Sequence, residues 1–336
     1  MSSDATTEYG YQPGDAATRG ELGPAGVSGR LRGRSVLEDT DLSPDEIDDV
    51  LRTAARLKGM RERREPHTYL TGKTLALLFQ HPSTRTRTAF QVGMEQLGGQ
   101  AIFLGASELH LKRGETLGDT AEVFSRYADA IAVRVAAHDD LLAFAAGATK
   151  PVYNALTAKC HPIEAWGDLL ALRERFGDLR GLKFAYLGDG NNVCHSLMLA
   201  LTAMGTSVAV AAPERYQPAA AVVETARALA ARDGATVELT ENPFEAATGA
   251  DAVYTDVHQS MGEQDDTLKA TLLASYRVTR SIMIRAKPTA VFMHCLPMRR
   301  GEEVEPEVAD GPQSVIFEQA EARLHVHKAL LLQTLW

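Results

Sequence analysis

Three hydroxyl groups and two guanidinium groups stand in five consecutive residues, Ser83-Thr84-Arg85-Thr86-Arg87. The apolar run 74–79 precedes them, and apolar residues at helical spacing follow from Ala89. The segment therefore lies where a strand ends and a helix begins, where free N–H groups and the helix dipole favour an anion. Ser and Thr are also ordinary helix caps. Together, however, these residues supply the donors that a phosphate dianion needs, and they favour an anion site.

Two further polar residues, Arg134 and His161, would need a hydrogen-bonding or charged partner if their side chains are buried. Arg134 closes the apolar run 131–135, although an arginine at a strand end can also reach solvent. His161 begins a predicted helix in His161-Pro162-Ile163-Glu164. It could donate to a carbonyl oxygen or hold a phosphate, and it could equally be a capping or core histidine. Each residue alone leaves both interpretations open.

Polar loops follow two later predicted strands. Gly188-Asp189-Gly190-Asn191-Asn192 resembles a nucleotide-binding turn but does not match G-x-G-x-x-G; its asparagines instead offer amides to a polar ligand. After the strand ending at residue 255, Asp256 can pair with an ammonium group. The backbone of Ser260-Met261-Gly262 can meet a carboxylate, so this loop could hold an α-amino acid. A solvated loop with a helix cap is the plainer alternative.

The tetrapeptide His294-Cys295-Leu296-Pro297 follows the apolar run 290–293. Metal binding would need further ligands, and none stand at a useful spacing. A cysteine nucleophile would need a base and an orienting group, and neither is evident. The pattern favours a positioned thiol and backbone carbonyls that face a cleft.

Length and composition limit the classes of protein. The chain has 336 residues, of which 45% are hydrophobic and 24% charged, as in soluble two-domain proteins. Its net charge of -9 argues against nucleic-acid binding, so an anion site must be built from local positive charge. The three cysteines form no zinc or disulfide pattern, which favours a reducing cytoplasm. No apolar run predicts a membrane span.

Short apolar runs alternate with helical patterns, which is typical of α/β proteins with parallel, doubly wound sheets. We expect two such domains joined by helices, with the active site in the cleft between them. The predicted strands are 75–79, 101–104, 130–135, 151–153, 183–187, 207–211, 236–239, 252–255 and 290–293. The predicted divisions are a disordered tail (1–33), a first domain (34–160), a linking helix (161–180), a second domain (181–313) and a C-terminal helix that packs back on the first domain (314–336).

The order of these motifs resembles that of ornithine carbamoyltransferases, within the aspartate/ornithine carbamoyltransferase superfamily, from about residue 34 to the end. The resemblance implies transfer of the carbamoyl group of carbamoyl phosphate to L-ornithine, with no metal or organic cofactor. It implies a carbamoyl phosphate site made of Ser83, Thr84, Arg85, Thr86, Arg134, His161, Glu164, Cys295, Leu296 and Arg323, of which Arg85, Arg134, His161 and Cys295 are catalytic. It implies an ornithine site made of Asn192, Asp256, Ser260 and Met261. It also implies a homotrimer in which His110 reaches the phosphate of the neighbouring subunit.

The chain departs from the family pattern at several positions. Gln80 and His81 replace the usual glutamate and lysine, and Trp166-Gly167 replaces Leu-Ala. Glu164 replaces a glutamine that accepts a hydrogen bond from the carbamoyl amine, and it adds a negative charge near a phosphate dianion. A nearby cation could compensate, the carboxylate could be protonated or turn away, or the substrate could differ. The alternatives are a carbamoyltransferase for another diamino acid or amine, or an inactive ligand-binding homologue.

Overall fold

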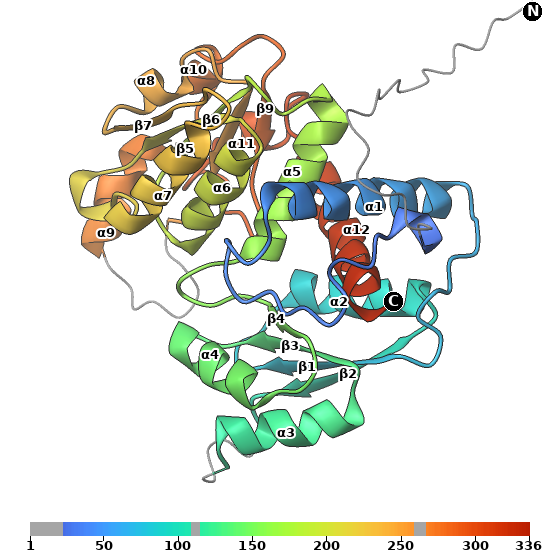
Figure 1. The fold of residues 1–336 in the computed structure, drawn as a ribbon. Helices are drawn as coiled ribbons and strands as arrows, with labels where there is room; N and C mark the ends of the chain where they lie inside the picture. Colours follow the sequence, from blue (N-terminus) through green and yellow to red (C-terminus); the bar gives the residue numbers. More distant parts are fainter. Residues whose placement is uncertain (1–22, 109–114, 259–266) are drawn as a thin grey trace, which may run out of the picture.

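Two parallel β-sheets form the framework of the computed structural model, which describes residues 23–108, 115–258 and 267–336 (Figure 1). The first sheet has the strand order β2-β1-β3-β4 and the second the order β7-β6-β5-β8-β9. Every strand pair is parallel. The first sheet comprises β1 (Thr74–Phe79), β2 (Gln100–Gly105), β3 (Ala130–Arg134) and β4 (Val152–Asn154). The second comprises β5 (Lys183–Leu187), β6 (Ser207–Ala211), β7 (Val237–Thr240), β8 (Ala252–Thr255) and β9 (Val291–Met293). The predicted α/β class with two doubly wound sheets is confirmed.

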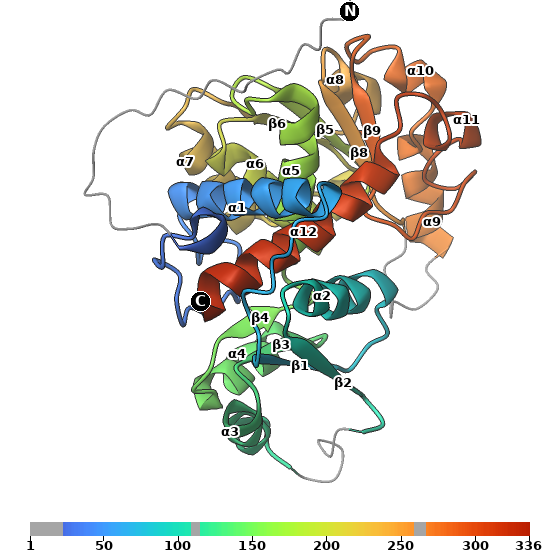
Figure 2. The same ribbon diagram turned by 90° about the vertical axis from the view of Figure 1, so that its right-hand side faces the viewer.

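Helices connect successive strands and cover the sheets (Figures 1 and 2). They are α1 (Pro44–Glu62), α2 (Thr84–Gln96), α3 (Leu117–Tyr127), α4 (His138–Gly147), α5 (Pro162–Phe176), α6 (Asn192–Ala203), α7 (Ala220–Ala230), α8 (Pro243–Ala247), α9 (Thr267–Leu273), α10 (Arg280–Met283), α11 (Pro306–Ala309) and α12 (Ile316–Leu335), with short 3₁₀ turns η1 (Pro24–Gly26), η3 (Glu214–Tyr216) and η4 (Ala274–Tyr276). Among the described residues, no helix combines the length and apolar composition needed to cross a membrane.

The predicted strands agree with the structure to within one residue at each end. The predicted disordered tail is wrong for residues 23–33, whereas residues 1–22 lie outside the described part of the chain. Val27 and Leu31 are fully buried and belong to the same core cluster as α1. These buried side chains, with the hydrogen bond from the Gly33 N–H to the Thr334 carbonyl, anchor a segment whose glycine- and alanine-rich composition predicted disorder.

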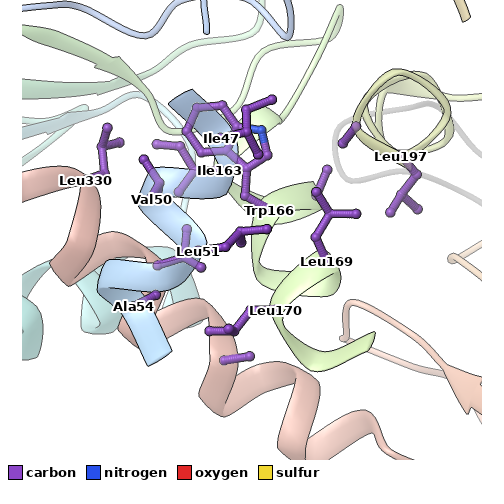
Figure 3. Packing of buried hydrophobic residues seen from close by; sticks show 14 of the residues in the cluster. Ile47, Val50, Leu51, Ala54, Ile163, Trp166, Leu169, Leu170, Leu197 and Leu330 are labelled. Atoms are coloured by element: carbon purple, nitrogen blue, oxygen red, sulfur yellow. The ribbon is translucent and has the colours of Figure 1, made fainter. Parts of the chain in front are cut away.

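Helices α1, α5 and α12 cross between the two sheets and pack against one another (Figure 2). Trp166 of α5 is buried against α1, near Ile47 and Leu51 (Figure 3). The next residue, Gly167, faces α12 so closely that a Cβ there would lie 3.1 Å from the Cα of Arg323. The unusual Trp166-Gly167 pair thus has a packing role, because it fills the core on one side and lets α12 approach on the other.

Acid should destabilise the fold through a buried histidine of α12. His327 is fully buried and its Nδ1 lies 2.7 Å from the Arg323 carbonyl oxygen. Burial lowers the pKa of His327 to about 3, from 6.5. Between these values the unfolded chain binds a proton that the folded chain excludes, so stability falls as pH drops below 6.5. We expect this residue to cost about 1.4 kcal/mol at about pH 5.5.

Urea unfolding at about pH 7.5 and about pH 5.5 tests this expectation. His327→Gln should lose less stability between the two pH values than the wild type does. The exposed His81 provides a matched control, and His81→Gln should keep the wild-type pH dependence. If His327→Gln loses as much stability as the wild type, His327 does not contribute to acid sensitivity.

Candidate active site

The polar residues picked out in the sequence gather where the order of each sheet reverses. In the first sheet β1 and β3 are neighbours, and in the second β5 and β8 are neighbours. Their carboxyl ends carry the segment at Ser83, Arg134, the loop at residues 188–192 and Asp256. Ligands of open parallel sheets bind at such points. The topology therefore directs the predicted residues of both sheets toward one region.

The start of α2 is open to an anion. Ser83 is the N-cap residue, but its side chain does not cap the helix, so the first-turn N–H groups keep their binding capacity. The simple capping role for this serine is therefore wrong. A cavity of about 750 Å³ is lined by Ser83 and Thr84, together with Gln80, His81, Arg87 and Phe103. This cavity does not include Arg85 or the buried Thr86, which lie outside its lining.

Three guanidinium groups approach one another beside this helix start. Arg134 and Arg323 are buried and Arg85 is partly buried. Burial, followed by the charge of Arg85, lowers the pKa of Arg134 to about 10. Burial, followed by the charges of Arg85 and Arg134, lowers the pKa of Arg323 to about 9. All three remain charged at neutral pH, so the structure holds like charges together out of water, as an anion-binding site requires.

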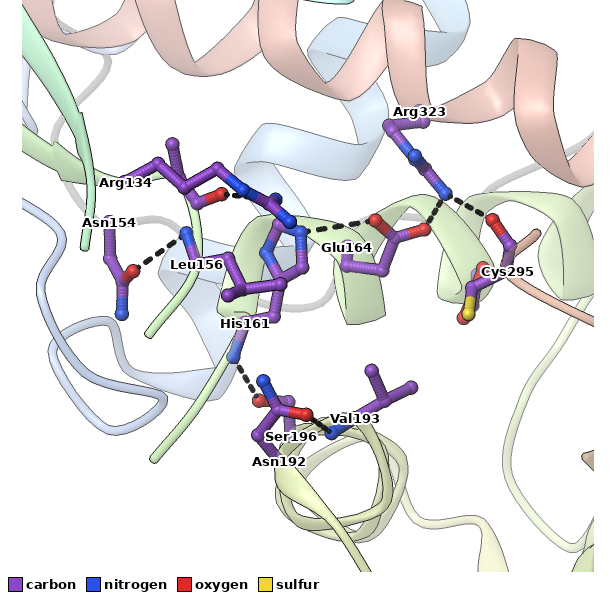
Figure 4. Close-up of polar contacts among 12 residues, drawn as sticks. Arg134, Asn154, Leu156, His161, Glu164, Asn192, Val193, Ser196, Cys295 and Arg323 are labelled. Carbon is purple, nitrogen blue, oxygen red and sulfur yellow. Dashed lines mark hydrogen bonds and ion pairs between the residues drawn. The ribbon is translucent and has the colours of Figure 1, made fainter. Parts of the chain in front are cut away.

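Among the described residues, Glu164 is the only carboxylate that forms an ion pair with one of these three arginines. It is 4% exposed and forms an ion pair with Arg323 (Figure 4). Its Oε2 lies 3.2 Å from His161 Nε2. The side chain therefore does not turn away, and Arg323 is the compensating cation that the sequence left open. Neither Arg85 nor Arg134 has a carboxylate within ion-pairing distance among the described residues.

His161 joins the two halves of the molecule. Its backbone N–H donates to Ser196 Oγ of α6 at 2.8 Å, whereas its ring faces Glu164 (Figure 4). Burial, with the charges of Arg134 and Arg323, holds the ring pKa well below its usual value. The ring is therefore neutral. The Arg134 Nη1 donates to the Ala155 carbonyl at 3.3 Å, while its Nε has no partner in the described structure.

Asp256 and Cys295, which follow β8 and β9, are hydrogen-bonded to each other and contact the arginine group. The Cys295 thiol donates to Asp256 Oδ1 at 3.1 Å, and Asn191 Nδ2 donates to Asp256 Oδ2 at 2.8 Å. Burial and the Asp256 charge raise the thiol pKa well above its usual value, so the sulfur is a protonated donor rather than a nucleophile. The Cys295 carbonyl accepts from Arg323 at 3.0 Å (Figure 4). This hydrogen bond connects the Asp256–Cys295 pair to the Arg323 guanidinium group.

The two neighbouring asparagines have different partners. Asn191, which the family resemblance did not place in the ornithine site, caps α6 and donates to Asp256. Asn192, the predicted ornithine ligand, donates to the Thr157 carbonyl at 2.7 Å and so reaches the first half of the chain. The N-cap position after two glycines was the available signal for Asn191. His110, Ser260 and Met261 lie outside the described residues.

One group of potential metal ligands occurs among the described residues. The ligand atoms of Asp256, His294 and Cys295 lie within 4.8 Å of one another, although the sequence spacing gave no metal site. These atoms already have partners. His294 Nδ1 accepts from the Leu296 N–H at 2.9 Å, and the thiol donates to Asp256. The Asp256 carboxylate, the thiol and His294 Nδ1 are therefore satisfied by internal hydrogen bonds, whereas His294 Nε2 has no hydrogen-bond partner among the described residues.

Comparisons with known proteins agree with this arrangement. Residues 34–174 match the carbamoyl-P binding domain of aspartate/ornithine carbamoyltransferases, and residues 180–334 match their Asp/Orn binding domain. An ornithine carbamoyltransferase of Symbiobacterium thermophilum is 50% identical over 307 residues, covering 90% of this chain and 97% of the relative. One of Pyrococcus horikoshii is 46% identical over 302 residues, covering 90% and 95%. The solved ornithine carbamoyltransferase of Pyrococcus furiosus superposes with a TM-score of 0.88 at 46% identity, covering 91% and 98%. The chain belongs to the aspartate/ornithine carbamoyltransferase family.

Proposed function

We propose that this protein transfers the carbamoyl group of carbamoyl phosphate to the side-chain amine of L-ornithine, giving L-citrulline and phosphate. The main support for this proposal is the group of three arginines, Arg85, Arg134 and Arg323, beside the uncapped start of α2. Burying like charges together is costly, and Glu164 is the only carboxylate paired with them in the described residues, so a bound anion would offset much of that cost. Relatives that are 46–50% identical are ornithine carbamoyltransferases.

In this proposal the phosphate lies at the start of α2. Ser83, Thr84, Arg85 and Thr86 hold its oxygens through hydroxyls, helix N–H groups and one guanidinium. Arg134 and His161 face the carbonyl oxygen, and Arg323 contacts the same substrate. Glu164 accepts from the carbamoyl amine, and Cys295 and Leu296 line the carbamoyl end.

The neutral amine of ornithine attacks the carbamoyl carbon, and the carbonyl oxygen gains negative charge. Arg134 and Arg323 stabilise this negative charge. Such electrostatic stabilisation of the transition state is usually the largest single contribution to the rate enhancement of an enzyme. The carbon–phosphate oxygen bond then breaks, and phosphate leaves with the proton released by the amine. Asp256, Asn192, Ser260 and Met261 hold the amino-acid part of ornithine and orient the amine.

A panel of amines with carbamoyl phosphate tests the function. We expect ornithine to give the highest kcat/KM, because Asp256 directly follows β8 and offers a carboxylate to the α-ammonium group of an amino acid. Product and phosphate should form in equal amounts. Putrescine, which lacks both α-groups, should be the poorest diamine. Faster turnover of another diamino acid would reassign the acceptor, and no turnover of any amine would refute the transferase function.

We also propose a cytoplasmic homotrimer in which the segment containing His110 reaches the neighbouring subunit. The cavity beside Ser83 and Thr84, about 750 Å³, is large enough for an inserted loop. All three cysteines are free, which agrees with a reducing compartment. Light scattering should give a mass three times the 36.3 kDa of one chain. His110→Ala should then lower the affinity for carbamoyl phosphate without changing that mass.

A further inference from the structure

The two helices that carry Glu164 and Arg323 are joined a second time, one helical turn away from that ion pair. Asp168 lies one turn after Glu164 on α5, and Gln319 lies one turn before Arg323 on α12, so each pair shares a face of its helix. Gln319 Nε2 donates to Asp168 Oδ1 at 2.7 Å, and both side chains are buried. The ion pair and this hydrogen bond are therefore neighbouring links between two antiparallel helices.

The same hydrogen-bonded group reaches the second sheet at the ends of two strands. Tyr254 of β8 donates its hydroxyl to Asp168 Oδ2 at 3.0 Å. The backbone N–H of His294, which directly follows β9, donates to Gln319 Oε1 at 2.9 Å. The group thus joins the two helices and the two strand ends from which the surrounding site residues come.

Donors and acceptors in this group are fixed in one order. A backbone N–H can only donate, so the amide oxygen of Gln319 must face His294 and its amide nitrogen must face Asp168. Both carboxyl oxygens of Asp168 then accept, one from Gln319 and one from Tyr254. Burial raises the pKa of Asp168, whereas these two hydrogen bonds lower it. Reversing one side chain alone would bring two donors or two acceptors face to face, which is costly in a buried site.

Close packing of the two helices makes their register important for Arg323. A Cβ at Gly167 would lie 3.1 Å from the Arg323 Cα, so the helices are in near contact at this level. A slip of α12 by one residue would move Arg323 by about 1.5 Å along the helix axis and break the Asp168–Gln319 hydrogen bond. A misplacement of about 1 Å in a group that orients a substrate can lower a rate about 10²-fold.

We propose that Asp168 and Gln319 are positioning residues for carbamoyl transfer: their hydrogen bond sets the register of α12 against α5 and so holds Arg323 at the carbamoyl phosphate site. The effect on rate rests on the proposed function. Neither residue is a substrate ligand in that function, because each lies one helical turn away from the residue of its own helix that contacts the substrate.

Exchanging the two side chains tests this role. Asp168→Asn and Gln319→Glu should each lower kcat/KM for carbamoyl phosphate about 10–100-fold, measured well below the melting temperature of each variant. The double variant should stay within about threefold of wild type, because the new asparagine can donate to the new glutamate, which still accepts from the His294 N–H. Glu318→Gln, at an exposed neighbour on α12, is the control for charge and should leave kcat/KM unchanged.

A purely structural role gives a different result. In that case the single variants would melt at lower temperature, but kcat/KM of the folded protein would stay at the wild-type value, and the proposal would be wrong. A double variant as impaired as the weaker single variant would also overturn it.

The pH profile of Gln319→Glu alone gives a further readout. This variant places two carboxyl groups against each other, and they can share a proton only at low pH. Its kcat/KM relative to wild type should be at least about fivefold higher at about pH 6 than at about pH 8.5. The hydroxyl of Tyr254 and the charge of Asp256 also act on Asp168, and both are present in wild type and in the exchange variant. The exchange variant should therefore show a flat ratio, and a flat ratio for Gln319→Glu would contradict the geometry.

Gly167→Ala covers the case in which the single variants do not fold. The added Cβ presses on the backbone of α12 at Arg323 and leaves the polar group intact. KM for carbamoyl phosphate should rise at least about threefold. Gly59→Ala in α1 is the matched control, because its Cβ would meet only the flexible side chain of Arg63, and KM should not change. An unchanged KM in Gly167→Ala would show that the approach of α12 to α5 does not position Arg323.

Binding of inorganic phosphate separates this inference from the proposed function. Phosphate should raise the melting temperature of the wild type and the exchange variant equally, and that of each single variant less, because a ligand stabilises in proportion to its affinity. This measurement needs Arg323 in place but no turnover. A wild type that carbamoylates no amine would refute the proposed function, whereas equal phosphate responses in all four proteins would overturn the positioning role.

Discussion

Replacing Arg134 by methionine should lower kcat/KM for carbamoyl phosphate by about 10³-fold. The guanidinium closes β3 at the end that faces the site, it is 4% exposed, and its Nε has no protein partner. These features are expected of a donor held in place for a developing negative charge. Lysine should restore part of the loss, because it keeps the charge but not the planar pair of donors.

The same substitution should not destabilise the protein. Arg134 is desolvated and lies near the charge of Arg85, and these two effects lower its pKa to about 10. Replacing a buried unpaired charge with an apolar side chain of similar length is commonly neutral or stabilising. The melting temperature of Arg134→Met should therefore equal or exceed that of the wild type.

Steady-state kinetics and thermal unfolding of the same preparations test both parts. Arg126→Met provides the control, because Arg126 is an exposed arginine of α3 that pairs only with Glu122 in the described structure. It should change neither quantity. If kcat/KM for carbamoyl phosphate falls less than tenfold in Arg134→Met, Arg134 does not stabilise the reacting oxygen. A marked fall in melting temperature would mean that its hydrogen bond to the Ala155 carbonyl mainly supports the fold.

Local patterns were enough to predict the framework of the site. The strands were predicted to within one residue because most of their apolar runs are short and bounded by polar or turn-forming residues. The anion segment was predicted because its donors follow β1 and begin α2, and both features are local. The carboxyl ends of β1, β3, β5 and β8 converge through the parallel topology, which the alternation of strands and helices also predicts.

Pairings between distant segments could not be predicted. The ion pair of Glu164 with Arg323 joins α5 to α12, and its formation depends on how closely Gly167 lets the two helices approach. The sequence indicated only that Glu164 needed a compensating group. Likewise, the sequence does not show which of the two adjacent asparagines contacts Asp256. The N-cap position of Asn191 at the start of α6 places its side chain beside Asp256. Such choices depend on tertiary packing rather than on local periodicity.

Glu164→Gln should lower the stability of the unliganded protein by about 3 kcal/mol, the cost of leaving a buried charge without its partner. Glu164 is the carboxylate partner of Arg323, and the neighbouring Arg85 and Arg134 already disfavour the Arg323 charge. Glutamine can still accept a hydrogen bond from Arg323 or His161, but it cannot neutralise the guanidinium. Urea unfolding without ligand measures this loss. Glu174→Gln removes a more exposed carboxylate from the same helix and is the control for net charge.

The same variant should bind phosphate groups more tightly. Removing the negative charge leaves Arg323 free to attract the dianion, so KM for carbamoyl phosphate should fall about tenfold, which corresponds to about 1.4 kcal/mol. Inorganic phosphate should then raise the melting temperature of Glu164→Gln more than that of the wild type, because a ligand stabilises in proportion to its affinity. The opposite signs of the two effects are the test: the charge that stabilises the empty site opposes its substrate. A KM that is unchanged or higher, together with an unchanged response to phosphate, would show that Glu164 stays paired with Arg323 and does not compete with the phosphate.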